Sequence, residues 1–287
     1  MKELEFLREQ QVDKGLIEGV EEFRCKYSVE DGEQGRVSCP DMYFYGREVL
    51  EMGIAALLQG ENLLLTGAKA TGKNVLAENL AWIFGRPVYN VSFHVNTDSG
   101  DLIGTDTFVN NEVQLRKGSI YRCAQYGGFG ILDEINMAKN DAVSVLHASL
   151  DYRRSIDVPG YAGTKELNEA LVSRFMVIDM PPQDEETLDY ILSSKFPALK
   201  ENAKKQWIGL FMDLQLKAQN GEISTKALDL RGILGALKTI QRGLKPRLAV
   251  QIGVVNKCFD IFEKEIVQDV VLTRIPDTWT PQDVFEK

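Results

Sequence analysis

The residues with the clearest chemical pattern are Gly67–Asn74, whose sequence GAKATGKN fits Gly-x-x-x-x-Gly-Lys. Glycines allow such a loop to surround a phosphate group with backbone N–H groups, because side chains would block the approach. Lys73 would then reach the outer phosphates as a point charge. The pattern alone also fits an ordinary glycine-rich turn. However, an apolar segment, 62–66, reads as a buried strand before it, and a helix is predicted over 73–84 after it, which favours a phosphate-binding loop.

Asn74 stands where a Ser or Thr hydroxyl usually ligates Mg²⁺ in such loops. An amide oxygen is an acceptable ligand for Mg²⁺, although this side chain is longer and its NH₂ group must point away from the metal. We therefore expect nucleotide binding, and the rate of turnover stays open. The residues expected to contact the nucleotide are Gly67, Ala68, Lys69, Ala70, Thr71, Gly72, Lys73, Asn74 and Val75.

Two adjacent acids, Asp133 and Glu134, follow the apolar segment 129–132, which is predicted to be another buried strand. At the carboxyl end of a strand the pair can divide its roles. Asp133 would hold Mg²⁺ together with Asn74, and Glu134 would polarise the attacking water as a general base. The alternative is an acid pair that caps a helix. The position after a strand, downstream of a phosphate loop, favours the catalytic interpretation.

Two arginines are candidates for contact with a transferred phosphate. Arg174 precedes the predicted strand 175–180, and from spacing alone a surface salt bridge explains it better than an arginine finger does. Arg231 lies among apolar residues on a helix predicted over 225–240. It is either directed at a ligand or extends its charged end to solvent. The aromatic residues Tyr43, Phe44 and Tyr45 could flank an adenine, but core packing is favoured.

Strand and helix signals alternate up to about residue 182, where Pro181 and Pro182 end a strand, and only helical spacing follows. This predicts an α/β fold, a three-layer P-loop NTPase domain with a parallel sheet, followed by a small all-helical lid. The expected divisions are a charged N-terminal extension (1–40), the nucleotide-binding domain (41–182), the lid (183–275) and a C-terminal tail (276–287). Helices are expected over 187–192, 207–218, 225–240 and 248–270.

The charge balance is acidic, with 33 Lys and Arg against 42 Asp and Glu and a net charge of −9. An acidic chain repels a polyphosphate backbone, so nucleic acid is an unlikely partner. No apolar run is long enough for a bilayer, and the charged start does not resemble a secretory signal. The four cysteines form no CxxC pair, which disfavours a zinc site and indicates reduced thiols in a cytoplasmic protein.

Several motifs resemble the MoxR/NorQ/CbbQ branch of the AAA+ ATPases, which is related to the dynein-like modules. The resemblance extends from about Met42 to Val271. Its motifs are the Walker A segment 60–80, the loop 101–104, the segment 118–124, the Walker B match 131–138, the segment 161–175 that ends in a finger arginine, and the sensor-2 segment 224–231.

The resemblance implies ATP and Mg²⁺ as ligands. It also implies that Arg174 acts as a finger on the neighbouring subunit and that Arg231 is the sensor-2 arginine. By the same resemblance, the chain forms a homo-oligomer, a hexameric ring. The ring would act on a separate partner protein, often one with a von Willebrand A domain, in a chaperone-like role of remodelling or activation.

One segment departs from the family. Between Leu150 and Tyr161 the family has a hairpin and then a strand that ends in a polar sensor-1 residue, whereas here only ten residues, 151–160, are available. In the family this strand lies between the Walker A and Walker B strands, so its loss would leave unpaired backbone in the sheet. We hypothesise that residues near Val158–Tyr161 are missing from this sequence. An unbroken, well-paired chain would instead indicate an ATPase without sensor 1.

Three functions are therefore compared. The first is an ATP hydrolase that remodels or activates a partner protein. The second is an assembly scaffold that binds ATP with weak or no hydrolysis, which Asn74 and the missing strand favour. The third is a nucleic-acid-linked NTPase motor of the restriction type, which the acidic charge disfavours.

Overall fold

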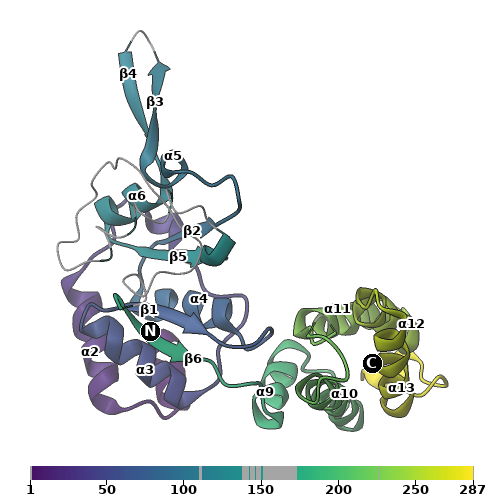
Figure 1. The fold of residues 1–287 in the computed structure, drawn as a ribbon. Coiled ribbons are helices and arrows are strands. Elements are labelled where there is room, and N and C mark those ends of the chain that lie inside the picture. Colours follow the sequence, from purple (N-terminus) through teal and green to yellow (C-terminus); the bar gives the residue numbers. More distant parts are fainter. Residues whose placement is uncertain are drawn as a thin grey trace. The chain divides into compact units, whose positions relative to one another are not determined.

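The computed structural model describes residues 2–109, 112–137, 142, 146, 150, 173–225 and 227–286. Contacts divide the chain into two compact units. We call residues 1–66 with 73–179 the α/β unit, and residues 67–72 with 180–287 the helical unit. Figure 1 shows strands with surrounding helices in the first and helices in the second. No helix in the described part of the chain is long and apolar enough to cross a membrane.

The α/β unit follows the predicted alternation of strands and helices. The phosphate-loop strand and the helix after it have the predicted bounds, and the strands predicted over 129–132 and 175–180 end within one residue of expectation. In chain order the elements are α1 (Lys2–Glu9), α2 (Lys14–Lys26), η1 (Gln34–Arg36), α3 (Arg47–Leu58), β1 (Asn62–Thr66), α4 (Lys73–Phe84), β2 (Val88–Ser92), α5 (Ser99–Ile103), β3 (Gly104–Val109), β4 (Glu112–Lys117), α6 (Ser119–Tyr126), β5 (Phe129–Asp133), η2 (Ile135–Met137) and β6 (Phe175–Asp179).

The parallel strands form two separate pairs within the described residues. β1 pairs with β6 from Asn62↔Phe175 to Thr66↔Asp179, and β2 pairs with β5 from Val88↔Phe129 to Ser92↔Asp133. No described strand joins the pair that carries the phosphate loop to the pair that carries the Asp133–Glu134 acids. That is where the family's sensor-1 strand was expected. The short segment 151–160 and the suggested break near Val158–Tyr161 lie outside the described residues.

The N-terminal segment, expected from the sequence to be a charged extension (1–40), packs onto the rest of the α/β unit. Helices α1 and α2 are amphipathic. The first packs against α2 and α4, and the second packs against α3 and α4. Arg24 donates from Nη1 to the carbonyls of Trp82 (3.1 Å) and Ile83 (2.8 Å), which lie at the end of α4. The buried apolar residues of the two helices are Leu4, Phe6, Leu7, Ile17 and Val20.

The aromatic residues 43–45 belong to this packing, as favoured over an adenine-binding role. The ring of Phe6 stacks on that of Tyr43 with centroids 5.0 Å apart, and Tyr43 lies 5.3 Å from Trp82. Phe44 is buried, and its backbone N–H donates to Asn79 Oδ1 over 3.1 Å. Tyr45 meets the edge of Phe6 at 6.3 Å. These contacts anchor the N-terminal segment to α4, the helix that follows the phosphate loop.

An antiparallel hairpin of β3 and β4 was not predicted from the sequence. It pairs Gly104 with Lys117 at its base, and Figure 1 shows it projecting from the α/β unit. Every residue of β4 is exposed, and Phe108 and Val113, which lie opposite each other, are 72% and 68% exposed. A strand without a buried face lacks the apolar alternation on which sequence prediction depends.

The helical unit contains α9 (Glu185–Lys195), α10 (Glu201–Gln219), α11 (Leu230–Gln241), α12 (Pro246–Gly253), η3 (Val255–Lys257), α13 (Ile261–Arg274) and α14 (Pro281–Val284). Two predicted helices were wrong in their bounds. The helix expected over 225–240 begins only at Leu230, and the helix expected over 248–270 is divided. The division has a local cause, because Asp260 starts a new helix by accepting the N–H of Glu263 over 3.0 Å.

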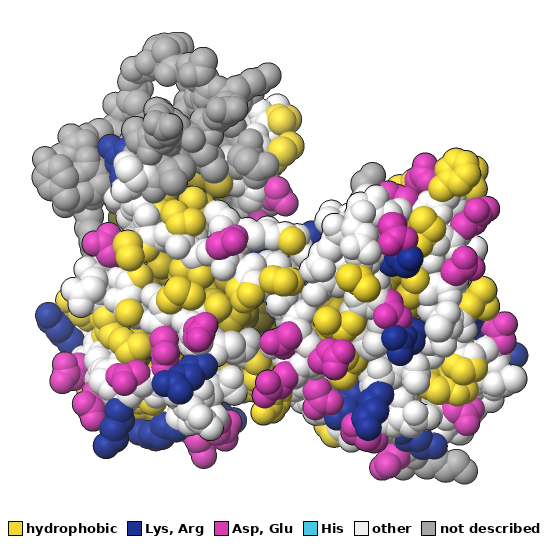
Figure 2. Space-filling model, turned by 60° about the horizontal axis from the view of Figure 1, so that its bottom comes forward, with side chains coloured by type: hydrophobic (Ala, Val, Ile, Leu, Met, Phe, Trp, Pro, Cys, Tyr) yellow, Lys and Arg dark blue, Asp and Glu magenta, His cyan; other side chains and the backbone are white. Residues whose placement is uncertain are grey.

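The last residues pack onto the helical unit, where the sequence suggested a tail. Val284 and Phe285 are buried, and the Phe285 ring lies 6.0 Å from that of Phe196. Lys200 donates its N–H to the Val284 carbonyl over 2.9 Å, and Leu199 forms a bridge with Phe285. Figure 2 shows acidic and basic side chains interspersed with apolar ones on the faces of both units.

Candidate active site

The phosphate loop has the backbone that its glycines were expected to allow. Gly67 and Gly72 have φ of 121° and 89°, and Ala70 has φ of 67°, in the left-handed region. Such alternation turns successive N–H groups toward one side, which makes a concave site for anions. Helix α4 starts directly afterwards at Lys73, and its first turn carries no acid that would cancel the positive helix end. The loop therefore fits a phosphate group.

Gly67 is also required for packing within the helical unit. A β-carbon at this position would lie 2.8 Å from the carbonyl oxygen of Met180, closer than real contacts allow. Two buried glutamines hold the loop from the same unit. Gln183 donates from Nε2 to the Thr71 carbonyl over 2.9 Å, and Gln215 of α10 donates to the Gln183 carbonyl over 3.1 Å. The loop is thus tied by hydrogen bonds to α10.

Sequence reasoning missed Gln183 and Gln215. Nothing in the sequence distinguishes a buried glutamine from a surface one, because the residue type is usually exposed. The remaining signal is the position of Gln183 directly after Pro181 and Pro182, at the end of the last strand.

Asn74 and Asp133 lie side by side, as predicted for a shared metal site. Asn74 is in the first turn of α4 and Asp133 is the last residue of β5. Asn74 Nδ2 donates to Asp133 Oδ2 over 2.9 Å. Two oxygen atoms at this distance would repel each other, so the donor end of the amide faces Asp133.

The chemistry of this pair suits Mg²⁺, because a carboxylate and an amide carbonyl are oxygen ligands. To present its oxygen beside Asp133, the Asn74 amide must turn about its last bond. No group of three or more His, Cys, Asp or Glu side chains in the described part of the chain forms a separate metal site.

Glu134 has a backbone conformation that non-glycine residues rarely adopt. Its φ is 55°, its side chain is exposed, and its N–H donates to Asp133 Oδ1 over 3.0 Å. Such a conformation costs on the order of 1–3 kcal/mol and is concentrated at functional sites. Because of this turn the two acidic side chains lie in different surroundings: Asp133 faces Asn74, and Glu134 is exposed. This arrangement differs from an acid pair that caps a helix.

A hydrogen bond that the sequence did not predict joins the carboxyl ends of β1 and β6. Thr66 Oγ1 donates to Asp179 Oδ1 over 2.9 Å. Thr66 directly precedes Gly67, so this contact fixes the strand end from which the phosphate loop starts. The sequence signal for this contact was that Asp179, like Asp133, is an acid at the end of a strand.

Arg174 lies at the opposite end of the same strand pair. Asn62 Nδ2 donates to the Arg174 carbonyl over 3.4 Å, at the amino end of β1. From Asn62 to Thr66 the strand extends about 13 Å, at roughly 3.3 Å per residue. Because β1 and β6 are parallel, the backbone of Arg174 is separated from the start of its own phosphate loop by the length of the strand.

Arg231 is the second residue of α11 and is exposed, beside the buried Leu230. Its side chain makes no hydrogen bond or ion pair with any described residue. The start of α11 is electrostatically linked to the phosphate loop within the helical unit. Burial raises the pKa of Asp229, but the hydrogen bond and charge of Lys257, together with the charge of Lys69, outweigh it and hold this pKa below its ordinary value.

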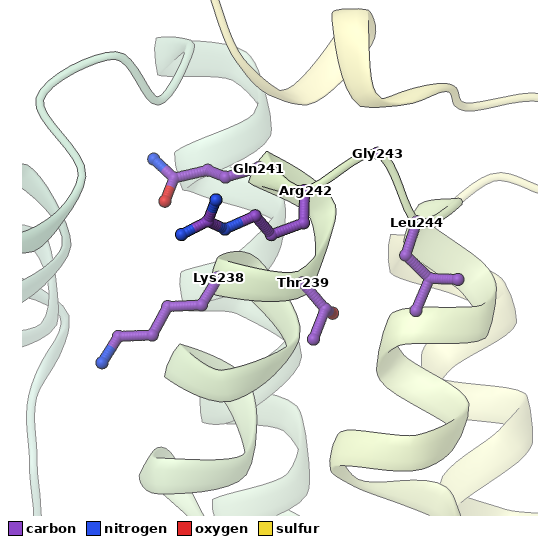
Figure 3. Close-up of a pocket in the computed structure, with 6 residues that line it drawn as sticks. All are labelled: Lys238, Thr239, Gln241, Arg242, Gly243 and Leu244. Carbon is purple, nitrogen blue, oxygen red and sulfur yellow. The ribbon is translucent and has the colours of Figure 1, made fainter.

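A hollow lies away from these residues, at the end of α11. It measures about 670 Å³, and its lining comes from the segment between Lys238 and Leu244. In Figure 3, Lys238 and Arg242 extend to the same side of that helix. None of the predicted site residues lines it, so size alone does not locate the chemistry of this protein.

Comparison with known proteins shows which family this chain resembles. Residues 62–196 match the model of the AAA domain of the dynein-related subfamily. The uncharacterized protein YojN of Bacillus subtilis is 32% identical over 249 residues, which cover 78% of this chain and 82% of YojN. The uncharacterized protein SERP0979 of Staphylococcus epidermidis is 27% identical, with 78% and 94% covered. A RuvB mutant from Thermotoga maritima aligns with a TM-score of 0.42 at 17% identity, over 84% of this chain and 89% of that one.

This chain belongs to the AAA ATPases, in their dynein-related subfamily. Its α/β unit has the P-loop NTPase fold with parallel strands, and a helical region follows it.

Proposed function

We propose that this protein is an ATP hydrolase that works at the subunit interfaces of a ring and remodels or activates a partner protein. The observation that carries the proposal is the position of Asn74, in the first turn of the phosphate-loop helix, 2.9 Å from Asp133 at the end of β5. It brings the phosphate-binding segment to the acids expected to serve hydrolysis.

Each residue has a role that follows from its place. The loop 67–72 and the start of α4 bind the phosphates, and Lys73 adds a positive charge there. Asn74 and Asp133 would hold Mg²⁺, which neutralises charge on the phosphates when it is bound. Glu134, exposed beside Asp133, accepts a proton from the attacking water.

Arg174 fits a role at the site of a neighbouring subunit. Its backbone lies at the amino end of β1, about 13 Å of strand away from its own loop at roughly 3.3 Å per residue. An arginine finger supplied by another chain stabilises charge on the transferred phosphate. Mixing two inactive variants tests this role. Arg174→Ala keeps its own site and lacks the finger, whereas Glu134→Gln keeps the finger and lacks the base.

We expect the mixture of Arg174→Ala and Glu134→Gln to recover part of the turnover that each variant lacks alone. A mixture as inactive as its components would overturn the role between subunits. Lys238→Ala is a suitable control variant, because Lys238 is an exposed basic residue of α11 outside the proposed site.

The hydrogen bonds of the phosphate loop suggest how hydrolysis performs work. Thr71 of the loop, Gln183 and Gln215 form a chain that ends on α10. Closing the loop around phosphates moves the Thr71 carbonyl, and the buried glutamines pass that movement to α10. We propose that this is how nucleotide state reaches the helical unit and then the partner protein.

The second candidate is a scaffold that binds ATP to assemble and hydrolyses little. The orientation of Asn74 favours it, since the amide presents its donor to Asp133. Glu134→Gln separates the two functions. In the hydrolase this change traps ATP and stops phosphate release, whereas in the scaffold the amount of bound ATP stays unchanged.

A further inference from the structure

A second polar cavity lies in the α/β unit, at the base of the β3–β4 hairpin. It has a volume of about 280 Å³. The basic residues Arg36, Arg116, Lys117 and Arg122 line it, and they come from η1, β4 and α6. None of them belongs to the phosphate loop or to the Asp133–Glu134 acids. Convergence of basic side chains from three elements on one small cavity requires an explanation, because like charges repel.

Two of these arginines are held in place by a buried acid. Glu33 is only 5% exposed. It accepts a hydrogen bond from Arg122 Nη2 at 2.6 Å and forms an ion pair with Arg36 Nε at 3.0 Å. The hydroxyl of Tyr89 also donates to Glu33, over 2.8 Å. The hydrogen bond from Arg122 holds the pKa of Glu33 below its ordinary value of 4.5, so Glu33 is charged at neutral pH.

The ring of Tyr89 stabilises the same two guanidinium groups. The Arg36 group lies 4.9 Å and the Arg122 group 5.9 Å from the ring centre, within the range of cation–π attraction. Each guanidinium has five N–H groups, of which its contacts with described residues use one or two, so donors remain for a ligand. Both arginine side chains are already ordered, so ligand binding would cost little additional side-chain entropy.

The start of α6 faces the same cavity. Gly118 and Ser119 line it, and α6 has no side-chain cap at Gly118 and no acid in its first turn. The first N–H groups of a helix have no partner within the helix and attract negative charge. A side chain at Gly118 would collide with the carbonyl of Leu102, which explains the glycine by packing rather than by ligand binding.

The charges do not cancel. Four positively charged side chains line the cavity. The described acids that oppose them are Asp101 in the lining and Glu33 behind it, so the net charge is about +2. Asp101 is engaged elsewhere, because its carboxylate accepts the N–H of Asp98 over 3.2 Å in a capping box. Arg116 is exposed, and its side chain has no hydrogen bond or ion pair with a described residue. The cavity thus has unused donors and unbalanced positive charge.

We propose that this cavity binds a small phosphate anion, either free phosphate or pyrophosphate or the phosphate end of a small metabolite. A compact dianion matches the charge, and planar arginines bind phosphate oxygens in pairs. The volume lies just below the range of roughly 300–1,000 Å³ typical of drug-sized ligands, which favours an anion with little attached to it. This site is separate from the proposed ATP site.

The test is titration calorimetry on the full chain carrying Lys73→Ala, which weakens the phosphate loop as a competing site. Inorganic phosphate, pyrophosphate and a nucleoside monophosphate are the probes. We expect saturable binding of at least one of them. Arg116→Gln should weaken it roughly tenfold, since a charge-assisted hydrogen bond is worth about one such factor. Lys117→Gln is a second variant, in case Arg116→Gln disturbs the hairpin.

Arg8→Gln is the matched control, because Arg8 is an exposed arginine of α1 outside the cavity. It should leave binding unchanged. Tighter binding of phosphate or pyrophosphate than of the nucleoside monophosphate identifies a free anion as the ligand, and the reverse order identifies a phosphorylated metabolite. No saturable binding of any probe at millimolar concentration overturns the proposal, and so does binding that neither cavity variant weakens. Neither result depends on whether the protein hydrolyses ATP.

Discussion

The side-chain amide of Asn74 donates to the carboxylate of Asp133 over 2.9 Å, joining the phosphate-loop helix to the end of β5. A shorter Thr or Ser at this position would present a hydroxyl oxygen to Mg²⁺ without turning an amide away from the carboxylate. This one residue therefore sets how readily the proposed metal site forms.

Replacement of Asn74 tests this relationship. We expect Asn74→Thr to lower the Mg²⁺ concentration needed for half-maximal turnover, by roughly tenfold if one hydrogen bond must otherwise be broken. Asn74→Ala should raise that concentration. Phosphate release measured across a Mg²⁺ series distinguishes the three chains. Equal Mg²⁺ dependence in all of them would exclude Asn74 from the metal site.

Gln183 is predicted to support both stability and nucleotide binding. Its replacement by alanine removes the donor to the Thr71 carbonyl inside a buried region, which costs on the order of 1–3 kcal/mol of unfolding free energy. The same change should weaken ATP binding, because the loop loses its support. Urea unfolding and nucleotide titration measure the two effects.

Gln219, the exposed last residue of α10, offers a matched control for Gln183. Gln219→Ala should change neither unfolding nor ATP affinity. Loss of stability in Gln183→Ala with unaltered ATP affinity would contradict the proposed link between the loop and α10.

The strained turn at Glu134 leads to opposite effects on stability and activity. Glycine adopts a φ of 55° without strain, so Glu134→Gly should raise the unfolding free energy by up to about 1 kcal/mol. Glu134→Gln keeps the strain and should leave stability unchanged. Both changes should abolish turnover. Thermal unfolding measures the stability of both variants, and an ATPase assay measures their turnover. A Glu134→Gly chain that is less stable than Glu134→Gln would refute the strain argument.

The buried Glu33 predicts a pH dependence of stability. Its pKa is lowered in the folded protein, chiefly by the hydrogen bond from Arg122, so the folded state favours the charged form. The stabilisation is then complete above the ordinary pKa of 4.5 and is lost as pH falls through the lower folded value. Glu33→Gln should therefore be less stable than the wild type at pH 7, and the difference should shrink below about pH 4.5.

Denaturant unfolding at several pH values measures this difference. Glu30 is the control, because it is exposed and forms no salt bridge with a described residue. Glu30→Gln should show no such trend. A Glu33→Gln chain with a pH-independent stability difference would contradict the role of the charged carboxylate.

The parts of the site that could be predicted are those with strong local signals. Strand β1, the loop 67–72 and helix α4 follow from an apolar run, glycines and a lysine in contiguous sequence. Asp133 and Asn74 were expected to share a metal site, because one follows a buried strand and the other follows the phosphate-loop lysine. The donor orientation of the amide did not follow, because it depends on which atom meets the carboxylate.

The features that were missed depend on tertiary contacts or lack a buried face. The β3–β4 hairpin has exposed strands, so its apolar pattern is weak. The charges of residues 1–40 concealed the amphipathic spacing that buries Leu4 and Leu7 of α1. Asp229, directly before α11, makes no side-chain cap and instead pairs with Lys257, which is distant in sequence. None of these contacts has a local signature.

The most direct test of the central claim is phosphate release from ATP with Mg²⁺, measured for the wild type and Lys73→Ala over a range of protein concentrations. We predict turnover per chain that rises with concentration, because Arg174 must come from a neighbouring subunit, and that disappears in Lys73→Ala. Turnover independent of concentration would contradict a shared site. Tightly bound ATP that is never hydrolysed, at any concentration, would contradict the hydrolase and favour the assembly scaffold.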